Sequence, residues 1–190
     1  VVISGRYEDT GTYSQMICDE AFCGKYNKEA LEQYVYPNMI SNGDFFTWGI
    51  YPYVWGRLYK KECLLPIQMQ VDDRITVGED VAVTYPLLLA AQSLFVMKEC
   101  YYHYRQTTDS MVKRLNDSEK EKKNAQILYR TVKEIFIKKN TKYNLMKQWD
   151  EYILVMMLTR VFDVYKKVFE LDYLYPFPEV KRGSKIILYG

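Results

Sequence analysis

Apolar residues recur at helical spacing through the last third of the chain. Ala125, Leu128, Val132 and Phe136 are separated by three or four positions, so they share one face of a predicted helix. The preceding Ser118-Glu119-Lys120-Glu121 has the form of a capping box, which starts a helix. A longer helix is predicted after Asn140 and up to about Glu170 by a second stripe, made of Leu145, Trp149, Tyr152, Ile153, Met156 and Val164. Two consecutive amphipathic helices predict an antiparallel pair.

Before residue 115 the apolar segments are shorter and alternate between strand and helix patterns. Residues 1–5, 55–59, 94–97 and 101–105 have the composition of strands. Asn27 is placed to cap a helix over 28–36, which Pro37 ends. Thr76-Val77-Gly78-Glu79 fits a second capping box, at the start of a helix through 81–91 with Pro86 as a kink site. The pattern predicts an α/β fold with a short mixed sheet and a C-terminal helical extension, helix-rich overall.

Both ends of the chain have the pattern of a strand. The first residues form a β-branched run without an initiator Met, and the last form an apolar run that ends at Gly190. We expect the parent protein to continue on both sides. Three parts are predicted: residues 1–114, a helical pair over 115–175, and a linker with the first strand of a following domain over 176–190.

Composition and charge narrow the classes of partner. The chain has 48% hydrophobic residues, as in a globular protein, and 19 tyrosines, which suit partly hydrated interfaces and polar-ligand clefts. A formal net charge of +2 indicates no nucleic-acid partner. Residues 113–147 carry 11 Lys/Arg against 4 Asp/Glu, a local charge of +7. This region is either a solvated helical face or a surface that contacts an anionic membrane or a phosphorylated substrate.

Cysteine and histidine usage argues against a zinc site. The four cysteines form no C-x-x-C pair, and there is a single histidine. Cys18 and Cys23 are spaced so that they can pair in an oxidising compartment, but no signal peptide precedes them. Reduced thiols and a cytoplasmic protein, peripheral on the inner face of the membrane if it binds there, are therefore expected. The apolar stretches are shorter than a membrane span.

The motifs that carry chemistry lie between Val54 and Arg114. They are Trp55-Gly56-Arg57-Leu58-Tyr59-Lys60-Lys61, then Gly78-Glu79-Asp80, then Tyr101-Tyr102-His103-Tyr104-Arg105, and finally Asp109-Ser110-Met111. In this order they resemble family-2 glycosyltransferases of the GT-A fold, especially bacterial enzymes of surface-polysaccharide and teichoic-acid biosynthesis in the cell envelope. The resemblance covers roughly residues 1–111. It implies that residues 1–114 are the C-terminal half of a GT-A-like domain.

The resemblance implies roles for individual residues. Asp80, with Glu79 beside it, is the expected general base, which takes the proton of the acceptor hydroxyl as that oxygen attacks the anomeric carbon with inversion. Arg105 is expected to contact the leaving diphosphate, because a guanidinium matches phosphate oxygens. The remaining expected substrate-binding residues are Trp55, Arg57, His103 and Ser110. Five of these seven residues also have a structural alternative: Glu79 and Asp80 as first-turn helix acids, Trp55 and His103 as packing residues, and Arg105 as an ion-pair residue.

The Asp-X-Asp motif with which this family holds Mg²⁺ or Mn²⁺ is expected before Val1. The chain alone is therefore expected to be inactive. Glu8 and Asp9 are not expected to be metal ligands, and Asp72-Asp73 is expected in a solvated loop. The partners implied are a nucleotide-sugar donor and a glycan, lipid-linked or polyol-phosphate acceptor. The alternative function is a non-catalytic interaction or membrane-surface docking module.

Overall fold

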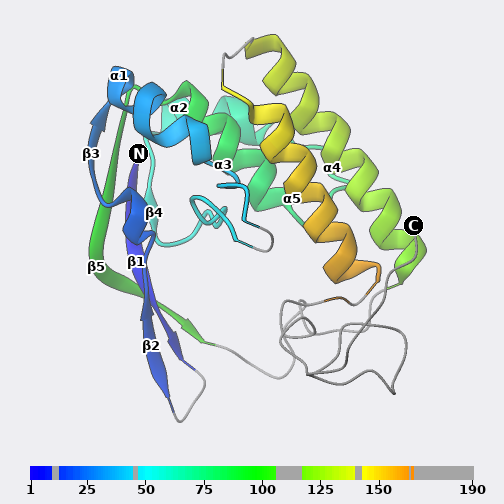
Figure 1. Ribbon diagram of the computed structural model, residues 1–190, viewed down its shortest axis with the longest axis horizontal. Coiled ribbons are helices and arrows are strands. Elements are labelled where there is room, and N and C mark those ends of the chain that lie inside the picture. Colours follow the sequence, from blue (N-terminus) through cyan, green and yellow to red (C-terminus); the bar gives the residue numbers. More distant parts are fainter. Residues whose placement is uncertain (10–12, 45–46, 106–116, 140–142, 163, 165–190) are drawn as a thin grey trace, which may run out of the picture.

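The computed structural model describes residues 1–9, 13–44, 47–105, 117–139, 143–162 and 164. It combines α-helices with a mixed β-sheet. In Figure 1 the sheet forms one side of the molecule, α3 lies in the middle, and α4 and α5 lie beyond it. The fold is therefore of the α and β type predicted from the sequence.

The sheet has five strands within the described residues, with the order β2-β1-β5-β3 and with β4 also paired to β1. The strands are β1 (Val2–Asp9), β2 (Ser14–Ile17), β3 (Gly24–Asn27), β4 (Arg57–Leu58) and β5 (Ser93–Arg105). β1 and β5 are parallel, and the other pairs are antiparallel. Because β1 and β5 run the same way, the chain must cross over between them, and α3 lies on that connection.

The strand predictions are partly right. Only Arg57–Leu58 of the predicted strand 55–59 is a strand. The two strands predicted over 94–97 and 101–105 are one continuous strand, β5. Exposed Lys98 and Glu99 lie where the pairing with β3 has ended and where the register of β5 against β1 shifts, between Val96 and Cys100. The strand therefore continues through two charged residues.

The helices are α1 (Lys28–Ala30), α2 (Lys61–Gln68), α3 (Glu79–Ala90), α4 (Ser118–Lys139) and α5 (Leu145–Arg160). As predicted, Asn27 caps α1, because its side chain accepts a hydrogen bond from the Ala30 N–H. The chain then stays helical through Leu31–Val35 and Tyr36–Asn38, so Pro37 lies within the last turn.

The predicted capping box at Thr76 is wrong. The residue before α3 is Gly78 in the left-handed conformation, with φ +89°, and no side chain caps the helix. At α4 the cap is Asp117 rather than Ser118, since the Asp117 carboxylate accepts from the N–H groups of Glu119 and Lys120.

The helical pair is confirmed, but its second helix ends at Arg160 and does not continue to about Glu170 as predicted. α4 and α5 pack antiparallel (Figure 1), and the buried residues of their stripes are Ala125, Leu128, Val132, Phe136, Leu145, Trp149, Tyr152 and Met156. These residues belong to one core together with residues of the sheet and α3, such as Ile3, Val81 and Leu94. A buried ion pair between Arg160 and Glu121, 2.8 Å long, joins α5 to α4. The predicted segment 176–190 lies outside the described residues.

Within the described residues, no helix is both long enough and apolar enough to cross a membrane.

Candidate functional site

The segment that connects Ile50 to Trp55 is extended and lies along α3. Three α3 side chains bind its backbone: Tyr85 donates to the Ile50 carbonyl at 3.0 Å, and Thr84 donates to the Pro52 carbonyl at 2.8 Å. Asp80 accepts a hydrogen bond from the Val54 N–H. Because Asp80 and Thr84 are four residues apart, they lie on the same face of the helix. α3 therefore fixes this segment by its backbone, at the alternate residues Ile50, Pro52 and Val54.

The other alternate residues of the segment carry aromatic rings that stack in a row. Tyr51 stacks on Tyr53 at 5.7 Å between ring centroids, and Tyr53 stacks on Trp55 at 4.4 Å. Trp55 continues the row onto β5, where it lies 4.5 Å from Tyr102 and 5.1 Å from Tyr104. All five rings are only partly exposed. The result is a half-buried aromatic wall, which we define as Tyr51, Tyr53, Trp55, Tyr102 and Tyr104.

A buried arginine of β1 backs the aromatic wall. The Arg6 guanidinium lies 4.7 Å from the Tyr51 ring and 4.9 Å from the Tyr53 ring, in the geometry of cation–π contacts. It also donates to the Glu8 carboxylate at 2.6 Å. Arg6 is 7% exposed, so its stem and head fill the space between the sheet and the extended segment.

Asp80 lies in the first turn of α3, and the surroundings of its carboxylate favour the protonated form. Burial raises the pKa of Asp80 above its ordinary value, and the neighbouring Glu79 carboxylate raises it further. The Val54 N–H and the Arg57 guanidinium act in the opposite direction on this pKa. The arrangement suits a carboxylate that accepts a proton, because such a group works best when its pKa approaches the working pH.

Arg57, on β4, interacts both with the extended segment and with Asp80. One of its nitrogens, Nη2, donates to the Tyr51 carbonyl, and its charge opposes the rise in the pKa of Asp80. A second carboxyl, Asp19, accepts a hydrogen bond from the Tyr51 N–H at 3.2 Å. Burial raises the pKa of Asp19, while that N–H, Arg57 and Arg6 lower it. Sequence reasoning missed Asp19 and Arg6, because both reach the site through contacts more than 30 residues distant along the chain.

The predicted site residues fall into two groups. Asp80, Glu79, Arg57 and Trp55 come together around the start of α3. Because β5 alternates, His103 and Arg105 point to the opposite face of the sheet from Tyr102 and Tyr104.

On that other face His103 stacks on Tyr7 at 4.8 Å and contacts the Asp9 carboxylate at 2.8 Å. The Asp9 carboxylate also accepts a hydrogen bond from the Ser14 hydroxyl. The contact with Ser14 and, after it, the contact with His103 lower the pKa of Asp9, and the charge of Arg105 lowers it less. Ser110 lies outside the described residues.

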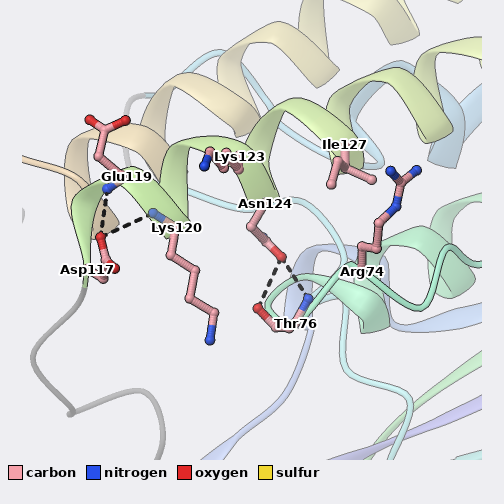
Figure 2. Close-up of a pocket in the computed structure, with 8 residues that line it drawn as sticks. All are labelled: Arg74, Thr76, Asp117, Glu119, Lys120, Lys123, Asn124 and Ile127. Carbon is pink, nitrogen blue, oxygen red and sulfur yellow. Dashed lines mark hydrogen bonds between the residues drawn. The ribbon is translucent and has the colours of Figure 1, made fainter.

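Two cavities lie near these residues, and neither is lined by Asp80 or Trp55. One, of about 750 Å³, is bordered by β1, β3, β4 and β5, with Tyr59 and Phe95 in its wall. The other, of about 340 Å³, separates the loop before α3 from the start of α4 (Figure 2). Its wall carries charges of both signs, including Arg74, Lys120 and Glu119. Arg74 is paired with Asp72 at 2.6 Å.

The described residues do not fit a bound Mg²⁺ or Mn²⁺. Within the described ranges, no three His, Cys, Asp or Glu side chains are grouped so that they can hold a metal ion. No step at this site is therefore assigned to a metal.

Comparison with models of protein families, with curated proteins and with solved structures finds no match to this chain.

Proposed function

We propose that this chain is part of an inverting glycosyltransferase of family 2, with a GT-A-like fold, and that Asp80 is its general base. The observation that carries the proposal is the setting of Asp80. Its half-buried carboxylate stands at the start of a helix, beside a cation and next to the aromatic wall. Four residues of the resemblance, Trp55, Arg57, Glu79 and Asp80, lie together there although they come from separate motifs.

The proposed reaction uses each of these features. The acceptor hydroxyl loses its proton to an Asp80 oxygen while its own oxygen forms the new bond to the anomeric carbon. The bond from that carbon to the diphosphate oxygen breaks, and the nucleoside diphosphate leaves with the electron pair. Before the transfer, Arg57 and the helix N-terminus favour the ionised form of Asp80, against the effects of burial and of Glu79. A pyranose ring can contact the exposed edges of the aromatic wall, because its inner rings cover one another's faces.

The donor is a nucleotide-activated sugar, and the acceptor is a glycan, a lipid-linked sugar or a polyol-phosphate polymer of cell-envelope polysaccharide biosynthesis. His103 and Arg105 lie on the other face of the sheet. They take no part in the transfer as proposed here. Mg²⁺ or Mn²⁺ would have to be held by residues other than those described, and would there supply charge that offsets the leaving diphosphate.

The test measures transfer and donor hydrolysis with a panel of UDP-, GDP- and CDP-sugars plus Mn²⁺. It is run on this chain and on the chain extended by any coding sequence that precedes Val1 in its gene. In whichever form is active, Asp80→Asn should lower kcat by about 100- to 10,000-fold, the range for loss of a general base. Asp73→Asn is the control, because Asp73 is an exposed carboxylate in the same part of the chain. Wild-type turnover by Asp80→Asn would rule out the proposed role.

A second candidate function is docking to an anionic membrane surface. It is favoured by the exposed cations of α4, which are Lys120, Lys123, Arg130 and Lys138. Co-sedimentation with phosphatidylserine vesicles should fall when the first three are changed to Glu. Unchanged binding by that variant would exclude α4 as the docking surface.

A further inference from the structure

The turn that leads into α3 is held by one side chain from α4. Asn124 is 3% exposed. Its Oδ1 accepts from the Thr76 N–H at 2.7 Å and from the Val77 N–H at 3.2 Å, and its Nδ2 donates to the Val77 carbonyl at 2.7 Å. Figure 2 shows Asn124 reaching from α4 to Thr76 beside the 340 Å³ cavity. These bonds join residues 47 or 48 positions apart.

A second contact from the same face of α4 follows the first. Leu128, one helical turn after Asn124, lies directly against Gly78, since a Cβ on that glycine would be 2.5 Å from the Leu128 Cδ2. The turn over residues 76–78 is therefore held by a polar and an apolar side chain of α4. Asp80 follows two residues later.

The side-chain amide of Asn124 matches both the hydrogen-bond donors and the acceptor of this turn. The turn presents two N–H groups and one carbonyl, and a side-chain amide offers an acceptor oxygen and donor N–H groups at once. Asn has a low helix propensity, because its side chain competes for backbone groups. Its place inside the 22-residue α4 therefore indicates a requirement other than helix formation.

We propose that Asn124 is a positioning residue that fixes the 76–78 turn and, through it, the orientation of the Asp80 carboxylate. The contact with the turn stands on the geometry alone, and its consequence for sugar transfer rests on the proposed function. By this proposal the α4–α5 pair is part of the site rather than a module beside it.

The surroundings of Asp80 give the proposal a measurable consequence. The groups that act on its carboxylate come from several elements: Glu79 on α3, Arg57 on β4 and the Val54 N–H. Tyr59 and Tyr152, the latter on α5, are also influenced by the Asp80 charge. A change in the first turn of α3 alters the position of the carboxylate against all of them. The pKa of Asp80 should therefore respond to loss of Asn124.

The experiment uses NMR on this chain, with Asn124→Ala as the perturbation. The Thr76 and Val77 amides should exchange with solvent at least about tenfold faster, because a lost hydrogen bond of ~1.4 kcal/mol corresponds to that factor. The carboxyl ¹³C titration of Asp80 should move toward the ordinary Asp value. Gln126→Ala is the control on α4, because Gln126 is exposed, and it should change neither signal.

Asn124→Asp provides a second variant if Asn124→Ala does not fold. It keeps an acceptor for the two N–H groups but removes the donor to the Val77 carbonyl. The Thr76 and Val77 amides should then exchange about as slowly as in the wild type, because they keep their acceptor. The Asp80 titration should still move, because the Val77 carbonyl loses its donor and the turn is no longer fixed on that side. An unchanged Asp80 titration in either variant would overturn the proposal, since Asn124 would then hold only the loop.

Activity separates this proposal from the proposed function. In the form that is active, Asn124→Ala should lower kcat by about 10- to 100-fold, the effect of misplacing a reacting group. The donor KM should stay unchanged. A wild-type kcat in a folded Asn124→Ala variant would overturn the positioning role. Wild-type turnover by Asp80→Asn would instead refute the proposed function and leave the NMR result intact.

Discussion

Gly78 offers a direct test of the packing between the turn and α4. Its backbone has φ +89°, and a Cβ added there would lie 2.5 Å from the Leu128 Cδ2. Gly78→Ala should therefore destabilise the fold in two ways. The left-handed backbone costs an L-residue about 1–2 kcal/mol. The overpacked contact adds about 1–3 kcal/mol, because Leu128 is 0% exposed and cannot move into solvent.

Gly43 separates these two contributions. It also has a positive φ, +93°, but nothing lies within 4 Å of an added Cβ. Gly43→Ala should thus cost only the backbone part, about 1–2 kcal/mol. Gly78→Ala should cost about 2–5 kcal/mol, the sum of the two contributions.

The assay is denaturant unfolding followed by circular dichroism and by the fluorescence of tryptophan, of which Trp149 is fully buried in the core. A double-mutant cycle with Leu128→Ala isolates the contact. Leu128→Ala alone should cost about 2–5 kcal/mol. The double variant should be more stable than the sum of the single changes predicts, by about 1–3 kcal/mol. Equal costs for Gly78→Ala and Gly43→Ala, or an additive cycle, would refute the reasoning.

Two further predictions concern charge. Arg57 lowers the pKa of Asp80, so Arg57→Met should raise that pKa and shift the acid limb of the kcat profile to higher pH; an unmoved limb would contradict this. Glu121 pairs with Arg160 where the two side chains are 10% and 13% exposed. Glu121→Ala should lower the free energy of unfolding by about 3 kcal/mol, because it removes one partner of a largely buried ion pair. Glu119→Ala, at an exposed pair, should cost less than about 1 kcal/mol in the same denaturation assay; equal costs would show that burial is irrelevant here.

Helical periodicity was the most reliable basis for predicting the fold. The stripes that became the buried faces of α4 and α5 were predictable, because helical periodicity depends only on neighbours a few residues away. α2 was not predicted, because it contains Pro66, a residue that disfavours a helix interior, and because none of its residues is buried.

The start of α3 shows where sequence reasoning fails. Thr76 and Glu79 have the spacing of a capping box, yet the turn is held by Asn124 from a distant helix. Nothing within ten residues of Thr76 signals that contact. Asn124 thereby satisfies the Thr76 N–H, which the Glu79 side chain of a capping box would have satisfied.

The side of the sheet to which each β5 side chain points could have been predicted from the sequence. Once Tyr102 and Tyr104 are placed against Trp55, alternation along a strand puts His103 and Arg105 on the other side. A motif of adjacent residues thus divides between two faces. Its members cannot all contact one ligand as long as the strand remains regular.

Asp80 holds the extended segment and is also the proposed base, so a single substitution there has two consequences. Asn keeps an acceptor for the Val54 N–H and removes the charge, whereas Ala removes both. Burial and Glu79 raise the pKa of Asp80, so the charged side chain lowers stability at neutral pH. That penalty disappears as the pH falls through the raised pKa. Asp80→Asn should therefore be at least as stable as the wild type at pH 7, and Asp80→Ala less stable. If both variants lose transfer activity, the loss in Asp80→Asn cannot be attributed to the fold, and the charge itself is required.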